Sequence, residues 1–118
     1  MSRDEKIALK ISLYVRNNLD KRLDISSLCR QFRLGKSTLE RIFNEVYYQP
    51  VHHYILTERM KKSSMLIRGT DIPIKRIASL CGFNSTTTFT RKFRKHFGIT
   101  PAALRKIEGN ADLFGSNG

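Results

Sequence analysis

The chain repeats one pattern of apolar and basic residues after about fifty positions. At a lag of 49 residues, the apolar positions of one segment align with those of another: Ile25, Leu28 and Leu34 with Ile74, Ile77 and Phe83. At a lag of 50, the segment that follows aligns as well: Thr38, Leu39, Arg41 and Phe43 with Thr88, Phe89, Arg91 and Phe93. The second copy therefore has one extra turn residue. A short helix, a turn and a second helix, occurring twice, predict two helix-turn-helix units.

Capping residues and helix breakers divide the rest of the chain into further helices. Ser2 and Asp24 are suited to begin helices, and Ser85 is suited to cap the helix that follows it. Pro50 suits the first turn of a long helix, and Gly98 is placed to end the helix after Ser85. No segment has the alternation of a strand. We expect an all-α fold of about seven helices.

The breakers also suggest how the chain is organised into parts. We expect a first helix-turn-helix subdomain at 1–49, a long connector helix at 50–68 and a second helix-turn-helix subdomain at 69–108. Residues 109–118 are rich in Gly and Asn, so we expect a disordered tail there. The connector has an apolar face and capping residues at both ends, which predicts a rigid helix.

The charge of the chain points to a polyanionic partner. Lys and Arg total 22 against 10 Asp and Glu, which gives a net charge of +12. Acids are absent from residues 86–106, whereas a merely soluble basic protein would mix acids with its bases. Two isolated cysteines, Cys29 and Cys81, do not form a disulfide framework or a zinc site and are expected in the core. No signal peptide or membrane span is evident, so a cytoplasmic protein is expected.

The segment at residues 83–98, FNSTTTFTRKFRKHFG, has an apolar face and an opposite polar face, as a recognition helix does. Phe89, Phe93 and Phe97 recur every fourth position and predict a packing face. The opposite side carries hydroxyl and basic side chains: Thr87, Thr90, Arg91 and Arg94. Short hydroxyl side chains let a helix approach base edges and can touch a thymine methyl. The alternative is a capped helix with an ordinary solvated basic face.

The first unit has a different set of residues at the equivalent positions. Ser37, Glu40, Arg41 and Asn44 face away from the predicted packing side. Arg can bond bidentately to guanine, Asn favours adenine, and Glu can accept from cytosine N4. Glu40 could equally be a surface acid paired with Lys36 one turn earlier.

Three pieces of the chain carry a family resemblance: LCRQFRLGKSTLERIF, YILTERMKKSSMLI and IASLCGFNSTTTFTRKFRKHFGITPAALRK. They resemble the DNA-binding domain of the AraC/XylS family of bacterial transcription regulators, over about residues 5–107. The resemblance implies seven helices, with a connector that holds two recognition helices in successive major grooves of double-stranded DNA. It also implies promoter activation through contacts with RNA polymerase.

The resemblance also implies which residues meet DNA. Base contacts fall on Ser37, Glu40 and Arg41 in the first recognition helix, and on Thr86, Thr87, Thr90 and Arg91 in the second. Phosphate contacts are expected from nearby hydroxyl and basic side chains: Lys36, Thr38, Lys75, Ser85, Arg94 and Lys95. Arg33, Tyr48 and Pro50 depart from the usual Gly and Pro placement of the family, so the first unit is expected to be set differently.

Other functions fit the sequence less well. The effector-binding domain of many family members is missing here, so the chain is either a short stand-alone regulator or an excised domain. No paired carboxylates, glycine-rich loop or ligand spacing among the histidines is present, so we expect no enzyme, cofactor or metal site. A related domain fused to an alkyl-accepting repair protein makes methyl transfer the enzymatic alternative. The remaining alternative is a sequence-indifferent architectural or RNA-binding protein.

Overall fold

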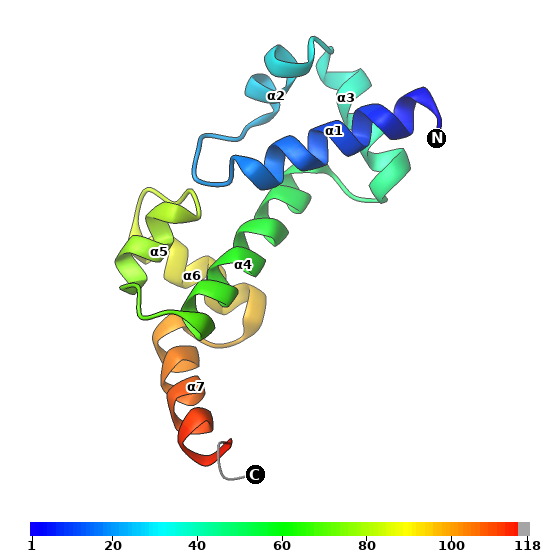
Figure 1. Ribbon diagram of the computed structural model, residues 1–118. Helices are drawn as coiled ribbons and strands as arrows, with labels where there is room; N and C mark the ends of the chain where they lie inside the picture. The colour runs from blue at the N-terminus through cyan, green and yellow to red at the C-terminus, as the bar shows by residue number, and fades with distance from the viewer. Residues whose placement is uncertain (116–118) are drawn as a thin grey trace. The chain divides into compact units, whose positions relative to one another are not determined.

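The computed structural model describes the backbone of residues 1–115 and the side chains of residues 1–109, and it is helical throughout (Figure 1). Within this described part there are seven helices and no strand, which confirms the all-α expectation. The helices are α1 (Arg3–Asn17), α2 (Ile25–Phe32), α3 (Lys36–Tyr47), α4 (Val51–Gly69), α5 (Ile74–Leu80), α6 (Thr86–Phe97) and α7 (Pro101–Gly115).

The chain divides into two compact units, which we call unit 1 (Met1–Arg59) and unit 2 (Met60–Gly118). The division falls inside α4, the helix that was expected to be the connector. Unit 1 contains the helix pair α2 and α3, and unit 2 contains the pair α5 and α6. Each pair is a short helix, a turn and a longer helix, as the sequence repeat predicts.

Local hydrogen bonds explain where the paired helices begin. Asp24 accepts a bond from the Ser27 backbone N–H at 2.8 Å, and the Ser27 hydroxyl bonds back to Asp24 in a capping box. Ser85 accepts from the backbone N–H of Thr88 at 3.0 Å at the start of α6. These caps satisfy backbone donors that a helix start would otherwise leave without a partner.

The core of unit 1 lies among α1, α2, α3 and the first half of α4. Its buried residues are Ile11, Val15, Leu19, Leu28, Leu39, Phe43, Val51, Tyr54 and Ile55. Ser12, also buried, shares a hydrogen bond with the Tyr47 hydroxyl at 3.0 Å and so satisfies a polar group beside the core. This packing holds one face of α3 inward and leaves the opposite face exposed.

In unit 2, α6 packs through its phenylalanines. Phe89 and Phe93 are fully buried and their rings lie 5.6 Å apart. Phe97 differs from the expected stripe because it is 40% exposed, although its ring lies 4.7 Å from that of Phe93. It occupies the last position of α6, where the helix extends past the buried core. Two residues therefore anchor this helix rather than three.

Arg105 fastens α7 to the end of α4. Its guanidinium donates to four backbone carbonyl oxygens, at distances from 2.6 to 3.4 Å: those of Leu66, Ile67, Thr70 and Ile72. The last carbonyls of a helix lack intrahelical partners, and a guanidinium carries five donors that can satisfy several of them. Arg105 thus fixes the position of α7 relative to the end of α4 in unit 2.

The two units use left-handed backbone at equivalent positions. Arg33 (φ 54°) follows α2, and its counterpart in the repeat is Gly82 (φ 84°). Tyr48 (φ 56°) ends α3, and its counterpart is Gly98 (φ 77°). Arg33 and Tyr48 therefore adopt the conformations that glycine adopts in unit 2. Unit 1 therefore differs from unit 2 in the residue types at these two positions, whereas the left-handed backbone conformation is the same in both.

The segment expected as a tail, residues 109–118, begins inside α7. The backbone of α7 remains helical to Gly115, so the helix continues through Gly109. Gly109 does not have the positive φ that ends α6 at Gly98, and no proline follows to stop the helix. The remainder of the expected tail, residues 116–118, lies outside the described residues.

Candidate nucleic-acid interface

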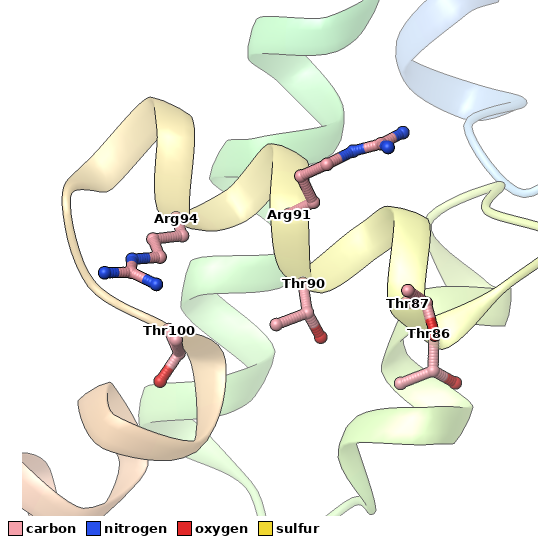
Figure 2. A pocket seen from close by; sticks show the side chains of 6 residues that line it. All are labelled: Thr86, Thr87, Thr90, Arg91, Arg94 and Thr100. Carbon is pink, nitrogen blue, oxygen red and sulfur yellow. The ribbon is translucent and has the colours of Figure 1, made fainter.

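A hollow of about 450 Å³ lies along the outer face of α6 and reaches the start of α7 (Figure 2). Its lining residues are Thr86, Thr87, Thr90, Arg91, Arg94 and Thr100. In Figure 2 the guanidinium groups of Arg91 and Arg94 extend in opposite directions from the helix, and Thr90 lies between them. Thr86 and Thr87 lie at one end of this hollow and Thr100 lies beside Arg94 at the other. We call it hollow 2.

A second hollow of about 430 Å³ lies along the outer face of α3 and reaches the start of α4. Its lining residues are Glu40, Arg41, Asn44, Pro50, Val51 and His52. Four of these positions, displaced by 50 residues, also line hollow 2: 40, 41, 44 and 50 correspond to 90, 91, 94 and 100. The sequence repeat thus places the same kind of surface in each unit, and we call this second surface hollow 1.

The structure brings most of the expected base-contacting residues to these two surfaces. Seven of the eight line a hollow, and the exception, Ser37, is exposed on the first turn of α3. The expected phosphate contacts are more scattered. Arg94 lines hollow 2, whereas Lys36, Thr38, Lys75 and Lys95 are exposed outside both hollows.

Ser85 already has a structural role. Its hydroxyl oxygen accepts from the Thr88 backbone N–H, and the hydroxyl lies 3.3 Å from Thr88 Oγ1 as a donor. The hydroxyl is therefore occupied as the cap of α6. A phosphate contact by Ser85 would have to share a group that already holds the start of the recognition helix.

Residues at the starts of α4 and α7 were missed by the sequence reasoning. Thr100 in unit 2 and Pro50, Val51 and His52 in unit 1 form the far wall of each hollow. Periodicity within a recognition helix does not indicate these residues, because they lie in the first turn of the next helix along the chain or immediately before it. The lag of 50 that aligns Arg41 with Arg91 also aligns positions 50 and 100, so the repeat contained the necessary signal.

Arg41 is held by two carboxylates in unit 1. Its Nη1 lies 3.1 Å from Glu45 Oε2 and 3.4 Å from Asp4 Oδ2. Glu40, in contrast, is exposed, and none of the ion pairs of the described residues joins it to Lys36. The alternative interpretation of Glu40 as the partner of Lys36 therefore lacks the ion pair that it requires.

The two units carry very different charge. Residues 1–59 contain eleven Lys and Arg against seven Asp and Glu, whereas residues 60–118 contain eleven against three. The same contrast exists on the recognition helices, because position 45 of α3 is Glu and its counterpart on α6 is Lys95. Unit 2 therefore presents the stronger attraction to a polyanion.

The described residues show neither a metal cluster nor a membrane-crossing helix. No three His, Cys, Asp or Glu side chains in that part of the chain gather closely enough to hold a metal ion. None of its helices combines the length and apolar character needed to cross a bilayer.

The fold and the paired hollows define a helix-turn-helix protein in which the motif is built twice. The family described as a helix-turn-helix domain matches residues 28–107. The chain belongs to the AraC/XylS family of transcription regulators.

Individual relatives agree with this membership. Over 94 residues, which are 80% of this chain, it is 34% identical to the right origin-binding protein of Escherichia coli, and it spans 32% of that protein's length. The C-terminal domain of AraT, a response regulator from Geobacillus stearothermophilus, matches with a TM-score of 0.84 at 23% identity over 90% of this chain and 88% of that one. The DNA-binding domain of AdpA, solved in complex with a target DNA, matches with a TM-score of 0.80 at 22% identity, covering 85% and 90%. The two structures support the fold.

Proposed function

We propose that the chain is a sequence-specific double-stranded DNA-binding transcription regulator in which α3 and α6 each enter a major groove. The observation that carries this proposal is the pair of hollows at equivalent positions of the repeat. Each lies on the face of a recognition helix opposite its buried residues, where a helix-turn-helix motif contacts base edges. Family membership supports the same function.

In hollow 2 the side chains suit thymine and guanine edges between two phosphate strands. The methyl and hydroxyl of Thr90 can meet a thymine methyl or a base acceptor at the centre. Arg91 and Arg94 diverge to either side, so one can take a guanine edge or a phosphate while the other reaches the opposite strand. Thr100 lies beside Arg94, and its oxygen already accepts from the Ala103 N–H, so its hydroxyl proton can donate to a phosphate.

Hollow 1 has a more selective set of side chains. Glu40, Arg41 and Asn44 include a carboxylate and an amide, each of which rewards particular base edges. A carboxylate also repels phosphate, so this surface contributes less to sequence-independent affinity. Because the two hollows differ, the preferred DNA site is expected to be non-palindromic, with two unlike half-sites.

The DNA-bound chain acts, in this proposal, as a promoter activator in the cytoplasm through contacts with RNA polymerase. The support is the AraC/XylS membership, for which such activation is the usual function. In vitro transcription from a promoter with the preferred site upstream tests this step. Added protein should raise transcript yield with that site and leave a scrambled site unchanged, whereas reduced yield would indicate a repressor.

A charge-matched pair of variants tests the proposed interface. Arg91→Ala removes a lining residue of hollow 2, while Lys92→Ala removes the same charge from an exposed neighbour that does not line it. By fluorescence anisotropy on the preferred duplex, Arg91→Ala should cost about 1 to 3 kcal/mol and relax one base preference. Lys92→Ala should cost less and leave base preferences unchanged. Equal effects of the two variants would show that α6 contributes charge alone.

Sequence-indifferent binding is the second candidate, and the eleven bases against three acids of unit 2 favour it. Both candidates predict that affinity falls by about three to five orders of magnitude between 50 and 200 mM salt, for six to ten phosphate contacts. Competition separates them. A sequence-specific protein keeps its labelled preferred duplex against excess random duplex and RNA, whereas an indifferent binder releases it equally to unlabelled preferred duplex, random duplex and RNA.

A further inference from the structure

We propose that Asp4 and Glu45 are positioning residues that orient Arg41 to bind a guanine edge and oppose its binding to phosphates of random DNA. This inference rests on the proposed DNA binding and names the side chains that set the specificity of unit 1. Asp4 lies in the first turn of α1, and Glu45 lies one turn after Arg41 on α3. Two helices thus converge on one guanidinium of hollow 1.

The geometry leaves the useful edge of the guanidinium available. Both carboxylates approach the same nitrogen, Arg41 Nη1, at 3.1 and 3.4 Å. The edge formed by Nε and Nη2 carries two parallel N–H donors, the arrangement that bonds bidentately to guanine O6 and N7. Arg41 is 52% exposed, so a base edge can reach it while the carboxylates hold it. The side chain is therefore oriented before DNA arrives, which reduces the entropy lost on binding.

The same carboxylates oppose contacts with phosphate. A phosphate near Arg41 would lie close to two negative groups, whereas the acceptors of guanine carry no net charge. Screening by water and salt makes each exposed ion pair weak, so each carboxylate is expected to change relative affinities by about two- to fivefold. The two acids together should therefore favour the correct base over random contacts.

Unit 2 provides an internal comparison. Arg91 occupies the position equivalent to Arg41, but the position equivalent to Glu45 is Lys95. None of the ion pairs in the described part of the chain involves Arg91. The two arginines thus have different electrostatic surroundings, so Arg91 attracts random phosphates more strongly than Arg41 does.

Neutral variants of the full chain, Asp4→Asn and Glu45→Gln, test the inference by anisotropy on the preferred duplex, its variants at each guanine, and a random duplex. Each should lower the ratio of preferred to random affinity about two- to fivefold and weaken the preference at one guanine. Asp4→Glu keeps the negative charge, so this variant should retain the wild-type ratio of preferred to random affinity. Glu5→Gln removes an exposed acid from the next position of α1 and serves as the matched control.

A double-mutant cycle gives the decisive comparison. In the Arg41→Ala background, neutralising Asp4 or Glu45 should no longer alter the guanine preference, because the positioned side chain is gone. The inference is overturned if either variant matches Glu5→Gln, if the ratio rises, or if the effect survives in Arg41→Ala. Failure of the wild-type chain to prefer any duplex would instead refute the proposed function. Circular dichroism of every variant checks that the helices are retained.

Discussion

Replacing Tyr48 by glycine should stabilise the protein. Tyr48 ends α3 in the left-handed conformation, at φ 56° and ψ 32°, and its backbone N–H donates to the Asn44 carbonyl at 2.8 Å. A side chain in this conformation brings its Cβ too close to the backbone, whereas glycine has no Cβ. The equivalent position of unit 2 is Gly98, at φ 77° with the same type of hydrogen bond to Arg94.

The size of the effect follows from two opposing terms. Left-handed backbone costs a non-glycine residue roughly 1 to 2 kcal/mol, and glycine gives back roughly 0.5 to 1 kcal/mol through greater freedom of the unfolded chain. The tyrosine ring contributes little to the balance, because Tyr48 is 88% exposed. Tyr48→Gly should therefore raise the free energy of unfolding by about 0.5 to 1 kcal/mol.

Urea unfolding followed by far-UV circular dichroism measures this change. Tyr48→Ala is the control, because alanine removes the ring but keeps the Cβ that causes the strain. The reverse change, Gly98→Ala, should destabilise by about 1 kcal/mol. Apart from Gly98 itself and its two chain neighbours, no atom lies within 4 Å of the position that a Cβ would take at Gly98, so that loss would report the backbone conformation rather than a clash with distant residues. If Tyr48→Gly is no more stable than Tyr48→Ala, the strain argument is wrong.

Three further changes test other parts of the structure. Arg105→Lys should lower the free energy of unfolding by about 1 to 3 kcal/mol in urea, because lysine cannot reproduce the fan of donors to carbonyl oxygens. The hydrogen bond from the backbone N–H of Ser27 lowers the pKa of Asp24 below 3.8, so the charged carboxylate stabilises the fold above that pH and this stabilisation is lost as the pH falls further. In an acid titration, the difference in free energy of unfolding between the wild-type chain and Asp24→Asn should therefore disappear. Burial raises the pKa of Tyr54 above 10.0, so stability should decline as pH rises past 10.0, and Tyr54→Phe should remove that decline.

The parts of the fold that depend on neighbouring residues could be predicted from sequence. The caps at Asp24 and Ser85 and the left-handed stop at Gly98 depend on residues within one turn, and the structure confirms each of them. The repeat predicted the two helix pairs because both copies retain the apolar spacing of a packed helix. The recognition faces followed from the same periodicity, since a buried face fixes the opposite one.

The parts of the structure that depend on contacts between residues far apart in the chain could not be predicted from the sequence. The approach of Asp4 to Arg41 joins residues 37 positions apart, and helical spacing within α3 contains no information about it. The exposure of Phe97 depends on where the core of unit 2 ends, although its spacing matches that of Phe93. The far wall of hollow 2 depends on how α7 starts beside α6, which brings Thr100 to the site.

Selection from a random duplex pool tests the central claim most directly, because it asks whether the chain reads sequence with both recognition helices. The pool is incubated with the protein, and bound duplexes are amplified, sequenced and measured individually by anisotropy. We expect two unlike half-sites about 34 Å apart, one turn of DNA, with loss of the second preference in Arg91→Ala and of the first in Arg41→Ala. A pool that yields no enriched sequence, with selected and random duplexes bound equally, would contradict the account.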